Sequence, residues 1–398
     1  MMFGLLLARA GVDVIVLEKH KDFFRDFRGD TIHPSTLQLM HELGWLDELL
    51  QQPHQKLQSM SVNFGGQTYP ISDLSRLPTV AKFVALVPQW DFLNFLARKA
   101  EDFPTFRLFM EHEVTGLLQA NGRITGVQVN TPEGPFEISA ALTVGCDGRH
   151  AITRDAAHMT VVERGVPIDV LWFGLSRCAD DPENALGYIN QGKMAVLIDR
   201  RDYFQIGYLI RKGAFPKIQA AGIEAFRQDL AELVPFLATP DTSGHRRIDE
   251  LTDLDQQLKL LTVQINHLQR WHVPGLLCIG DAAHAMSPVG GIGINLAIQD
   301  AVSAANILAK PLLNATPARP VPEGTIAEVQ HHRAWAVHVT QAFQAVAHKA
   351  VNRILGAKGP LKAPLFLRLV SRSAFLQRFA GRAIGIGILP EHIHSPKR

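Results

Sequence analysis

The segment 275–295 constrains the fold and the chemistry of this chain more than any other part of the sequence. The apolar run 275–279 predicts a buried strand, four glycines between 280 and 293 leave a loop with few side chains, and 296–309 has the pattern of a helix. The strand therefore delivers Asp281 to a helix N-terminus, where unpaired N–H groups and partial positive charge suit a phosphate or an electron-rich ring. Because the Asp281 carboxylate can also accept hydrogen bonds from sugar-like hydroxyls, the segment predicts a polyhydroxylated, anionic or reducible cofactor.

The first eighteen residues match the second half of a βαβ unit that binds a dinucleotide. Residues 3–10 predict a short helix closed by Gly11, and the mostly apolar run 12–17 ends in Glu18, where an acid can hydrogen-bond a ribose hydroxyl. The first strand and its G-x-G-x-x-G turn would lie upstream of Met1, so we expect either a truncated chain or a misassigned start. In that case the cofactor's pyrophosphate would lack its main cradle.

Composition places the chain among ordinary globular proteins. With 398 residues, 46% hydrophobic and 20% charged, it is long enough for one large or two intertwined domains. A formal charge of +2 argues against a nucleic-acid partner. Cys146, Cys178 and Cys278 lie far apart without metal-ligand spacing, which predicts reduced thiols in a cytoplasmic protein and no metal site. No secretory signal and no apolar run of about 18 residues is visible, so we expect no transmembrane segment.

The C-terminal region is strongly basic. Residues 351–398 contain nine Lys and Arg against one acid, Glu391, and large apolar residues lie between the charges: Leu365, Phe366, Leu369 and Phe375. This pattern suits a face that contacts a membrane surface or a partner. It also suits a terminal helix that packs its apolar stripe on the protein body and keeps its basic side chains in water. We favour the second interpretation. The sequence leaves the oligomeric state open.

The rest of the chain predicts a cofactor domain interrupted by a second sheet. The expected elements are helices at 34–46 and 88–100, a hairpin turning at Gly65-Gly66, a strand at 83–87, an antiparallel meander over 107–143, a central strand at 141–146, mostly strands over 161–210, a helical insert at 218–237 and a strand at 260–265. The dinucleotide pattern resumes near residue 276. The predicted fold class is therefore α/β, with a Rossmann-like part and a mostly antiparallel second sheet.

The Gly280-Asp281 segment and its following loop resemble the Gly-Asp motif of the FAD-dependent aromatic-ring monooxygenases related to para-hydroxybenzoate hydroxylase, the group A flavoprotein monooxygenases. In that family the aspartate meets the ribityl chain and the loop lies beside the isoalloxazine. The resemblance implies FAD contacts for Asp281, Pro288, Gly291, Gly293, Ile294 and Asn295.

Other segments resemble the same family. The loop 27–34 carries Arg28, which the resemblance places against the cofactor, where a planar cation can hydrogen-bond and stack. Asp147-Gly148 matches an Asp-Gly motif associated with FAD and the nicotinamide donor, although Ala151 replaces the usual hydroxyl residue. Gln89 stands where relatives place an arginine, so phosphate affinity could be lower. The full set of expected FAD contacts adds Glu18, Lys19, Arg28, Gln89, Val114 and Asp147 to those of the Gly-Asp segment.

The resemblance also implies domain boundaries. Residues 1–66, 90–160 and 268–398 would form a discontinuous FAD-binding domain that ends in C-terminal helices. Residues 67–89 and 161–267 would form the substrate-binding domain.

By the same resemblance, NADH or NADPH reduces the flavin, O2 adds to form a C4a-hydroperoxide, and the distal oxygen passes to an aromatic, often phenolic, small molecule. A helix that starts near Gly293 would stabilise negative charge at the edge of the reduced ring. The sequence identifies no catalytic base. Trp172, Tyr188 and Pro288 are candidates for substrate contact, although core packing explains Trp172 and Tyr188 more simply.

Alternative functions remain open at this stage. A related flavoenzyme can epoxidise or dehydrogenate on the same scaffold. A chain without its phosphate turn could also be a flavin-free remnant that only binds a ligand or partner. His284 follows Asp281 closely, but no nucleophilic serine elbow and no H-E-x-x-H pattern accompanies it, so we expect a structural role.

Overall fold

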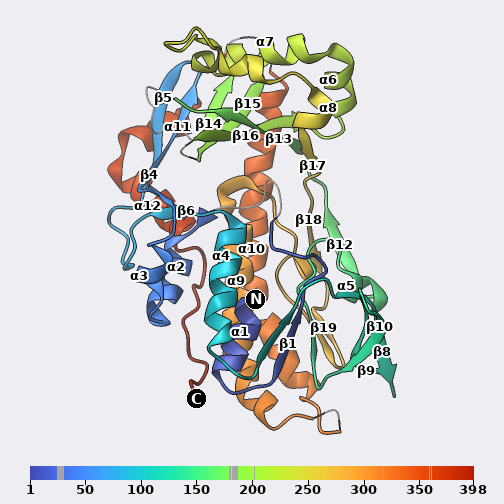
Figure 1. Cartoon of the computed structure of the whole chain (residues 1–398). Coiled ribbons are helices and arrows are strands. Elements are labelled where there is room, and N and C mark those ends of the chain that lie inside the picture. The colour runs from blue at the N-terminus through green and yellow to red at the C-terminus, as the bar shows by residue number, and fades with distance from the viewer. Residues whose placement is uncertain are drawn as a thin grey trace.

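The computed structural model describes residues 1–24, 31–178, 181, 187–200, 202–316, 318–357, 359 and 361–398. Two lobes are joined by one long helix, α10 (Glu323–Leu355), which runs from the lower lobe to the large sheet of the upper lobe (Figure 1). Both chain termini lie in the lower lobe.

Short parallel strand pairs and central helices build the lower lobe. Strands β1 and β7 are parallel, β11 and β20 are parallel, and β19 adds to β20 antiparallel. Across the described residues the two parallel pairs belong to separate sheets. The strands are β1 (Val14–Leu17), β7 (Phe106–Phe109), β11 (Thr143–Gly145), β19 (His272–Val273) and β20 (Leu276–Cys278), and the helices around them are α1 (Met2–Arg9), α4 (Gln89–Glu101), α5 (Ile152–Ala156) and α9 (Gly293–Leu313).

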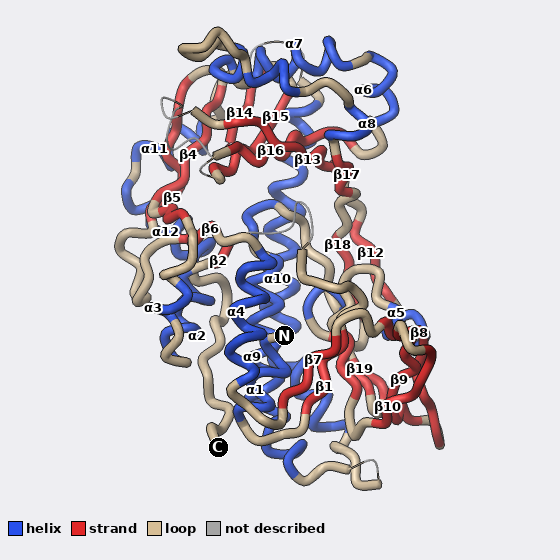
Figure 2. The backbone as a smooth tube through the Cα atoms, viewed as in Figure 1, coloured by secondary structure: helices blue, strands red, loops and turns tan. Residues whose placement is uncertain are grey.

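The helices α1, α4, α9 and α10 form the centre of this lobe (Figure 2). Their core includes Leu5, Leu277 and Val302, all at 0% exposure. Among the helices that the structure describes, only the stretch Val289–Leu313 is long and apolar enough to cross a bilayer, and 67% of its most apolar window is buried inside the protein. This burial explains its composition, because a helix surrounded by other elements is apolar on most of its faces.

Smaller elements flank the central helices. The predicted meander forms as β8 (Glu113–Ala120), β9 (Arg123–Thr131) and β10 (Gly134–Ser139), and β12 (Val161–Arg164) pairs with β18 (Ile265–Leu268). On the other side, β2 (Thr31–Ile32), β6 (Val84–Leu86) and β3 (Gln55–Leu57) form a small sheet beside α2 (Pro34–Glu42) and α3 (Leu46–Leu49).

The upper lobe is a large, mostly antiparallel sheet covered on both faces. In the described part of the chain its order is β17-β13-β16-β15-β14-β4-β5. Its strands are β4 (Ser59–Phe64), β5 (Gln67–Asp73), β13 (Ile168–Ser176), β14 (Gly187–Asn190), β15 (Lys193–Asp199), β16 (Tyr203–Arg211) and β17 (Lys259–Leu261). The outer face packs on α6 (Phe215–Ala221), α7 (Ile223–Leu233), α8 (Leu254–Gln257) and the 3-10 turns η1 (Pro235–Ala238) and η2 (Arg247–Glu250). The C-terminal half of α10 packs on the inner face, where Val351 meets Val170 and Leu209.

The predicted α/β class with a largely antiparallel second sheet is confirmed, but two local predictions need correction. The expected boundary at residue 66 divides the hairpin of β4 and β5, which lies whole in the large sheet. The single strand expected at 260–265 is two strands, β17 and β18, in different sheets.

Candidate functional site

Three strands of the lower lobe end close together. Glu18 follows β1, Asp147 lies two residues after β11, and Asp281 lies three residues after β20. The Met1 amino group interacts electrostatically with both Glu18, after β1, and Cys146, after β11, so the ends of these two strands lie in the same region. Because β11 and β20 are hydrogen-bonded neighbours, all three ends meet. In α/β sheets, ligands bind in the crevice outside such carboxyl ends.

Asp281 is presented to solvent by a tight turn. The 3-10 turn η3 (Gly280–Ala282) follows the buried strand β20, and Asp281 is exposed while Ala282 is fully buried. Gly280 has a φ of 61°, and a Cβ there would lie 3.0 Å from the Cβ of Ala297 in α9. Glycine is therefore required for this turn to pass so close to the helix. The carboxylate sits outside the protein interior, where a ligand can reach it.

A network of buried charged side chains holds the η3 turn in place. The Asp300 carboxylate accepts a hydrogen bond from the Gly280 N–H at 3.1 Å and contacts His284 Nε2 at 2.5 Å. Arg333 donates from Nε to Asp300 at 3.0 Å and from Nη1 to Glu391 at 3.1 Å. Burial opposes ionisation of Asp300, but the interactions with His284 and Arg333 outweigh it and hold the pKa of this carboxyl below its usual value. His284 therefore has the structural role that the sequence predicted.

Gly290 and Gly291 form a glycine hinge in the loop that follows η3, and a side chain at Gly291 would clash with strand β2. The 3-10 turn η4 (Val289–Gly291) contains Gly290 and Gly291, which have φ values of 84° and 62°. A Cβ at Gly291 would lie 2.2 Å from Thr31 Oγ1. Helix α9 begins next, at Gly293, and no side chain of the residues that the structure describes caps its N-terminus. Its first N–H groups therefore lack intrahelical partners and carry the positive end of the helix dipole.

Asn295 ties the hinge to strand β2. Its Oδ1 accepts hydrogen bonds from the His33 N–H at 2.9 Å and the Thr36 hydroxyl at 2.8 Å. Its Nδ2 donates to the carbonyls of Thr31 at 2.8 Å and Gly291 at 3.1 Å. This side chain is buried and occupied by the protein itself. A contact between Asn295 and a cofactor would therefore use the backbone N–H at the start of α9.

Helix α10 contributes residues that the sequence analysis missed. Gln344 accepts a hydrogen bond from the Ser287 N–H at 3.1 Å and donates to its carbonyl at 2.9 Å. His348 Nε2 lies 2.6 Å from Ser287 Oγ, and Gln341 donates to the Asn266 carbonyl at 2.7 Å. Gln341, Gln344 and His348 are buried and spaced three and four residues apart, which puts them on one helix face. The spacing of these three polar residues within an otherwise apolar stripe was the sequence signal that could have identified them.

Three predicted cofactor residues lie together at the end of β1. The Glu18 carboxylate accepts a hydrogen bond from the His20 N–H at 3.0 Å. Lys19 forms an exposed ion pair with Glu113 at 3.8 Å, and Val114 follows Glu113 in β8. The structure thus brings Glu18, Lys19 and Val114 to one edge of the candidate site.

Asp147 also supports its own loop. Its carboxylate accepts hydrogen bonds from the Thr153 N–H and hydroxyl, each at 2.9 Å, at the start of α5. Arg154 is buried and donates from Nη2 to the Arg149 carbonyl at 3.0 Å. The Asp-Gly segment is therefore fixed by local contacts at the edge of the site.

For the other predicted FAD contacts, Arg28 excepted, the structure gives the exposure of each residue and its place in an element. Gln89 is partly exposed and is the first residue of α4. Pro288 is exposed, and Ile294 is partly exposed in the first turn of α9. Arg28 lies outside the described residues.

The two aromatic candidates for substrate contact lie on opposite faces of the large sheet. Tyr188 is buried in the outer core and stands 6.2 Å from the ring of Phe236, on the side away from the lower lobe. The elements α7 and η1 pack on that face, so the structure gives Tyr188 a place in the core. Trp172 packs on the inner face, and its buried Nε1 has no hydrogen-bond partner among the described residues.

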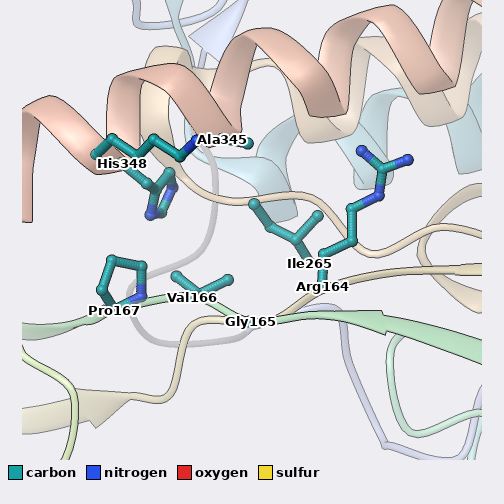
Figure 3. Close-up of a pocket in the computed structure, with 8 residues that line it drawn as sticks. Arg164, Gly165, Val166, Pro167, Ile265, Ala345 and His348 are labelled. Atoms are coloured by element: carbon teal, nitrogen blue, oxygen red, sulfur yellow. The ribbon is translucent and has the colours of Figure 1, made fainter.

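A cavity of about 410 Å³ opens between α10 and the link from β12 to β13 (Figure 3). His348 lines it and also contacts Ser287, so the cavity borders the loop that leads to Pro288. Its wall is apolar, and its charged side chains are basic. The lining residues are Arg164, Gly165, Val166, Pro167, Ile265, Ala345, His348 and Lys349. In the part of the chain that the structure describes, no group of three or more His, Cys, Asp or Glu residues could hold a metal ion.

Curated relatives of this chain include several monooxygenases. A 6-methylpretetramide 4-monooxygenase of Streptomyces rimosus is 28% identical over 396 residues, which cover 95% of this chain and 88% of that protein. A 12-dehydrotetracycline 5-monooxygenase/anhydrotetracycline 6-monooxygenase of the same species is 27% identical over 316 residues, or 75% of this chain. The aligned part spans only 59% of that longer protein.

Comparison with solved structures and families agrees on the fold. A variant of PqsL from P. aeruginosa superposes with a TM-score of 0.74 at 20% identity, covering 89% of this chain and 94% of that one. Residues 1–319 match the sequence family described as FAD binding domain. This match covers most of the chain and includes every strand end and loop of the candidate site, so the chain belongs to the FAD binding domain family.

Proposed function

We propose that this chain binds FAD and hydroxylates an aromatic, in particular a phenolic, small molecule, with NADH or NADPH as electron donor and O2 as oxygen source. The observation that carries the proposal is the exposed Asp281 carboxylate, held after β20 in a turn that packs on α9 near Ala297. Family membership supports the cofactor. The relative from Streptomyces rimosus, a monooxygenase by name, supports the reaction class.

The donor and acceptor groups at this site fit FAD. Asp281 and Glu18 are acceptors suited to ribityl and ribose hydroxyls. The N–H groups of Gly293 and Ile294, which have no intrahelical partner at the start of α9, are donors suited to the polar edge of a flavin ring. Gly290 and Gly291 keep the intervening loop free of side chains, so that a flat ring can approach the backbone.

Bound FAD would supply the redox chemistry, taking electrons from the nicotinamide and delivering one oxygen atom to the substrate ring. The protein's task is then placement and electrostatics. The dipole of α9 stabilises negative charge at the ring edge next to Gly293. Asp300, Asn295 and Gln344 hold the surrounding turns through buried hydrogen bonds, which keeps these donors in fixed positions.

The surroundings of the loop favour an apolar substrate with an acidic hydroxyl. Trp172 and the neighbouring inner face of the large sheet are apolar. The cavity beside His348 adds Arg164 and Lys349, and none of its lining residues in the described part of the chain is an acid. Basic groups beside an apolar wall stabilise a phenolate, the electron-rich form that accepts oxygen. We assign the substrate part to the large sheet, including the hairpin β4–β5, and the FAD-binding part to the lower lobe.

Flavin titration of the purified full chain tests the proposal. Asp281→Ala should raise the Kd for FAD by about tenfold or more, since a hydrogen bond to a charged group contributes about 1.5–3 kcal/mol. Asp47→Ala, which removes another exposed carboxylate on α3, is the matched control and should leave the Kd unchanged. Equal affinity of Asp281→Ala and the wild type would remove the site assignment.

The reaction class needs a separate assay. Substrate-stimulated consumption of NAD(P)H with a product that gains one oxygen atom on an aromatic ring is the expected result. An epoxide or a desaturated product would identify another flavin-dependent oxidoreductase. A colourless protein that cannot be loaded with FAD would identify a binding protein without redox activity.

A further inference from the structure

The C-terminal helices α11 (Leu365–Arg372) and α12 (Ala374–Gly385) expose large apolar side chains. The exposed fractions are Leu365 70%, Phe366 74%, Leu369 53%, Phe375 75% and Phe379 66%. The sequence pattern favoured packing of this stripe on the protein body, and the structure contradicts that expectation. Exposed apolar clusters of this kind mark interaction surfaces.

The opposite face of α12 is the one that contacts the protein. Gly381 and Gly385 are buried there, and a Cβ at Gly381 would lie 2.2 Å from the Asp73 carbonyl oxygen of β5. A Cβ at Gly385 would lie 2.8 Å from Leu77. These two glycines, four residues apart, seat the helix directly against its neighbours. The helix is therefore held in the orientation that directs Phe375 and Phe379 outward.

The apolar side chains are spaced to form a single outward face on each helix. Leu365 and Leu369 are separated by four residues, as are Phe375 and Phe379, which places each pair on one side of its helix. Val370 is the buried residue of α11. We call the five exposed apolar residues and the basic residues beside them the α11–α12 surface.

Basic side chains surround these apolar residues. The exposed ones are Lys362, Arg368, Arg372, Arg378 and Arg382. Arg378 pairs with Asp73 at 3.7 Å. From residue 356 to residue 390 the sequence contains no Asp or Glu, and Glu391, which follows, is buried against Arg333. The surface is therefore cationic, and its occupant has to be anionic as well as apolar.

These charges discriminate between the possible occupants. A second copy of the chain, related by a two-fold axis, would place this basic surface against itself, and like charges would repel. A nucleic acid would satisfy the arginines but offers no apolar environment for the phenylalanines. A bilayer with anionic headgroups satisfies both, because apolar side chains enter the acyl boundary while arginines meet phosphates.

We propose that the α11–α12 surface docks this protein on anionic phospholipid membranes. The proposal does not depend on the reaction that the protein catalyses. The surface is also connected to the candidate site. The Ile384 carbonyl in α12 contacts His33 Nδ1 at 2.8 Å, and the His33 N–H is bound by Asn295, which also holds strand β2. Helix α12 therefore links the α11–α12 surface to the part of the lower lobe that borders the candidate site.

Vesicle co-sedimentation of the full chain tests the proposal. The protein should pellet with vesicles of phosphatidylglycerol and phosphatidylcholine at low salt, bind pure phosphatidylcholine weakly, and lose binding as salt is raised. The double variant Phe366→Asp/Phe375→Asp should lower partitioning by about tenfold or more, because it places charges in the apolar layer. Arg368→Gln/Arg372→Gln should lower binding to anionic vesicles only.

Phe343→Asp on α10 is the matched control, since Phe343 is 58% exposed but lies outside this surface. It should bind vesicles like the wild type. Absence of binding to anionic vesicles at low salt, or an equal loss in Phe343→Asp, would overturn the proposal. So would a dimer detected by light scattering that Phe366→Asp/Phe375→Asp dissociates, because the surface would then join two copies.

Discussion

Arg333 Nε lies 3.0 Å from Asp300 Oδ1, and both side chains have 0% exposure. Asp300→Asn would keep an oxygen near the Gly280 N–H but leave Arg333 with less compensation for its buried charge. Breaking a buried pair in this way costs about 3–5 kcal/mol. We expect a loss of that size in the free energy of unfolding measured by urea titration.

The control for this change is Asp155→Asn. Asp155 pairs with Arg154 at 3.1 Å, but its side chain is 67% exposed. An exposed pair contributes about 0–1 kcal/mol, so the control should remain close to the wild type. Equal unfolding free energies for both variants would show that the Asp300 network does not support the fold.

Two alanine variants, Gly291→Ala and Gly293→Ala, distinguish an effect of backbone strain on stability from an effect of an added side chain on FAD binding. Gly291 has a φ of 62°, and its added Cβ would lie 2.2 Å from Thr31 Oγ1, so this variant should lose about 1–3 kcal/mol of stability. At Gly293 the nearest heavy atom to an added Cβ is 3.7 Å away, in Met286, so the fold should tolerate alanine. If a flavin ring approaches this backbone, Gly293→Ala should still weaken FAD binding. Calorimetry and flavin titration measure the two effects separately.

Asn295 offers a test of the clamp between α9 and β2. Asn295→Asp keeps the acceptor for the His33 N–H and the Thr36 hydroxyl but removes the donor to the carbonyls of Thr31 and Gly291. It also buries a negative charge beside those carbonyls, so we expect a loss of about 2–4 kcal/mol. Hydrogen exchange should show faster exchange at 31–33 and 291–295. Protection equal to the wild type would contradict the clamp.

The stability of the protein should fall on acidification partly through His33. Burial lowers the pKa of His33 to about 4, against the opposing effect of its hydrogen bond to the Ile384 carbonyl. Below about pH 6.5 the unfolded chain binds a proton that the folded chain does not, so stability falls until about pH 4, by roughly 3 kcal/mol at most. His33→Gln should flatten this slope, whereas His41→Gln, at an exposed site, should not. Urea midpoints at several pH values measure the difference.

Local sequence determined the elements that build the site. The apolar run before Gly280 forms strand β20, the glycine-rich loop follows, and α9 starts near the predicted place. The exposure of Asp281 also follows from local steric rules, because a glycine turn after a buried strand projects the next polar residue outward. Periodicity and backbone sterics act over a few residues, so one sequence is enough to predict them.

Only the tertiary structure decided which residues hold the site in place. Asn295 was predicted to contact the cofactor, but its side chain bonds to Thr31, 264 positions away in the chain. The spacing of Gln344 marked its face of α10, but the sequence identified no partner for Gln344 or Arg333, because their partners lie on other elements. The same reason explains the C-terminal helices. Their apolar stripe was visible in the sequence, but the buried contacts of Gly381 and Gly385 decided that it faces outward. Long-range partners depend on how elements pack, and no local pattern encodes that choice.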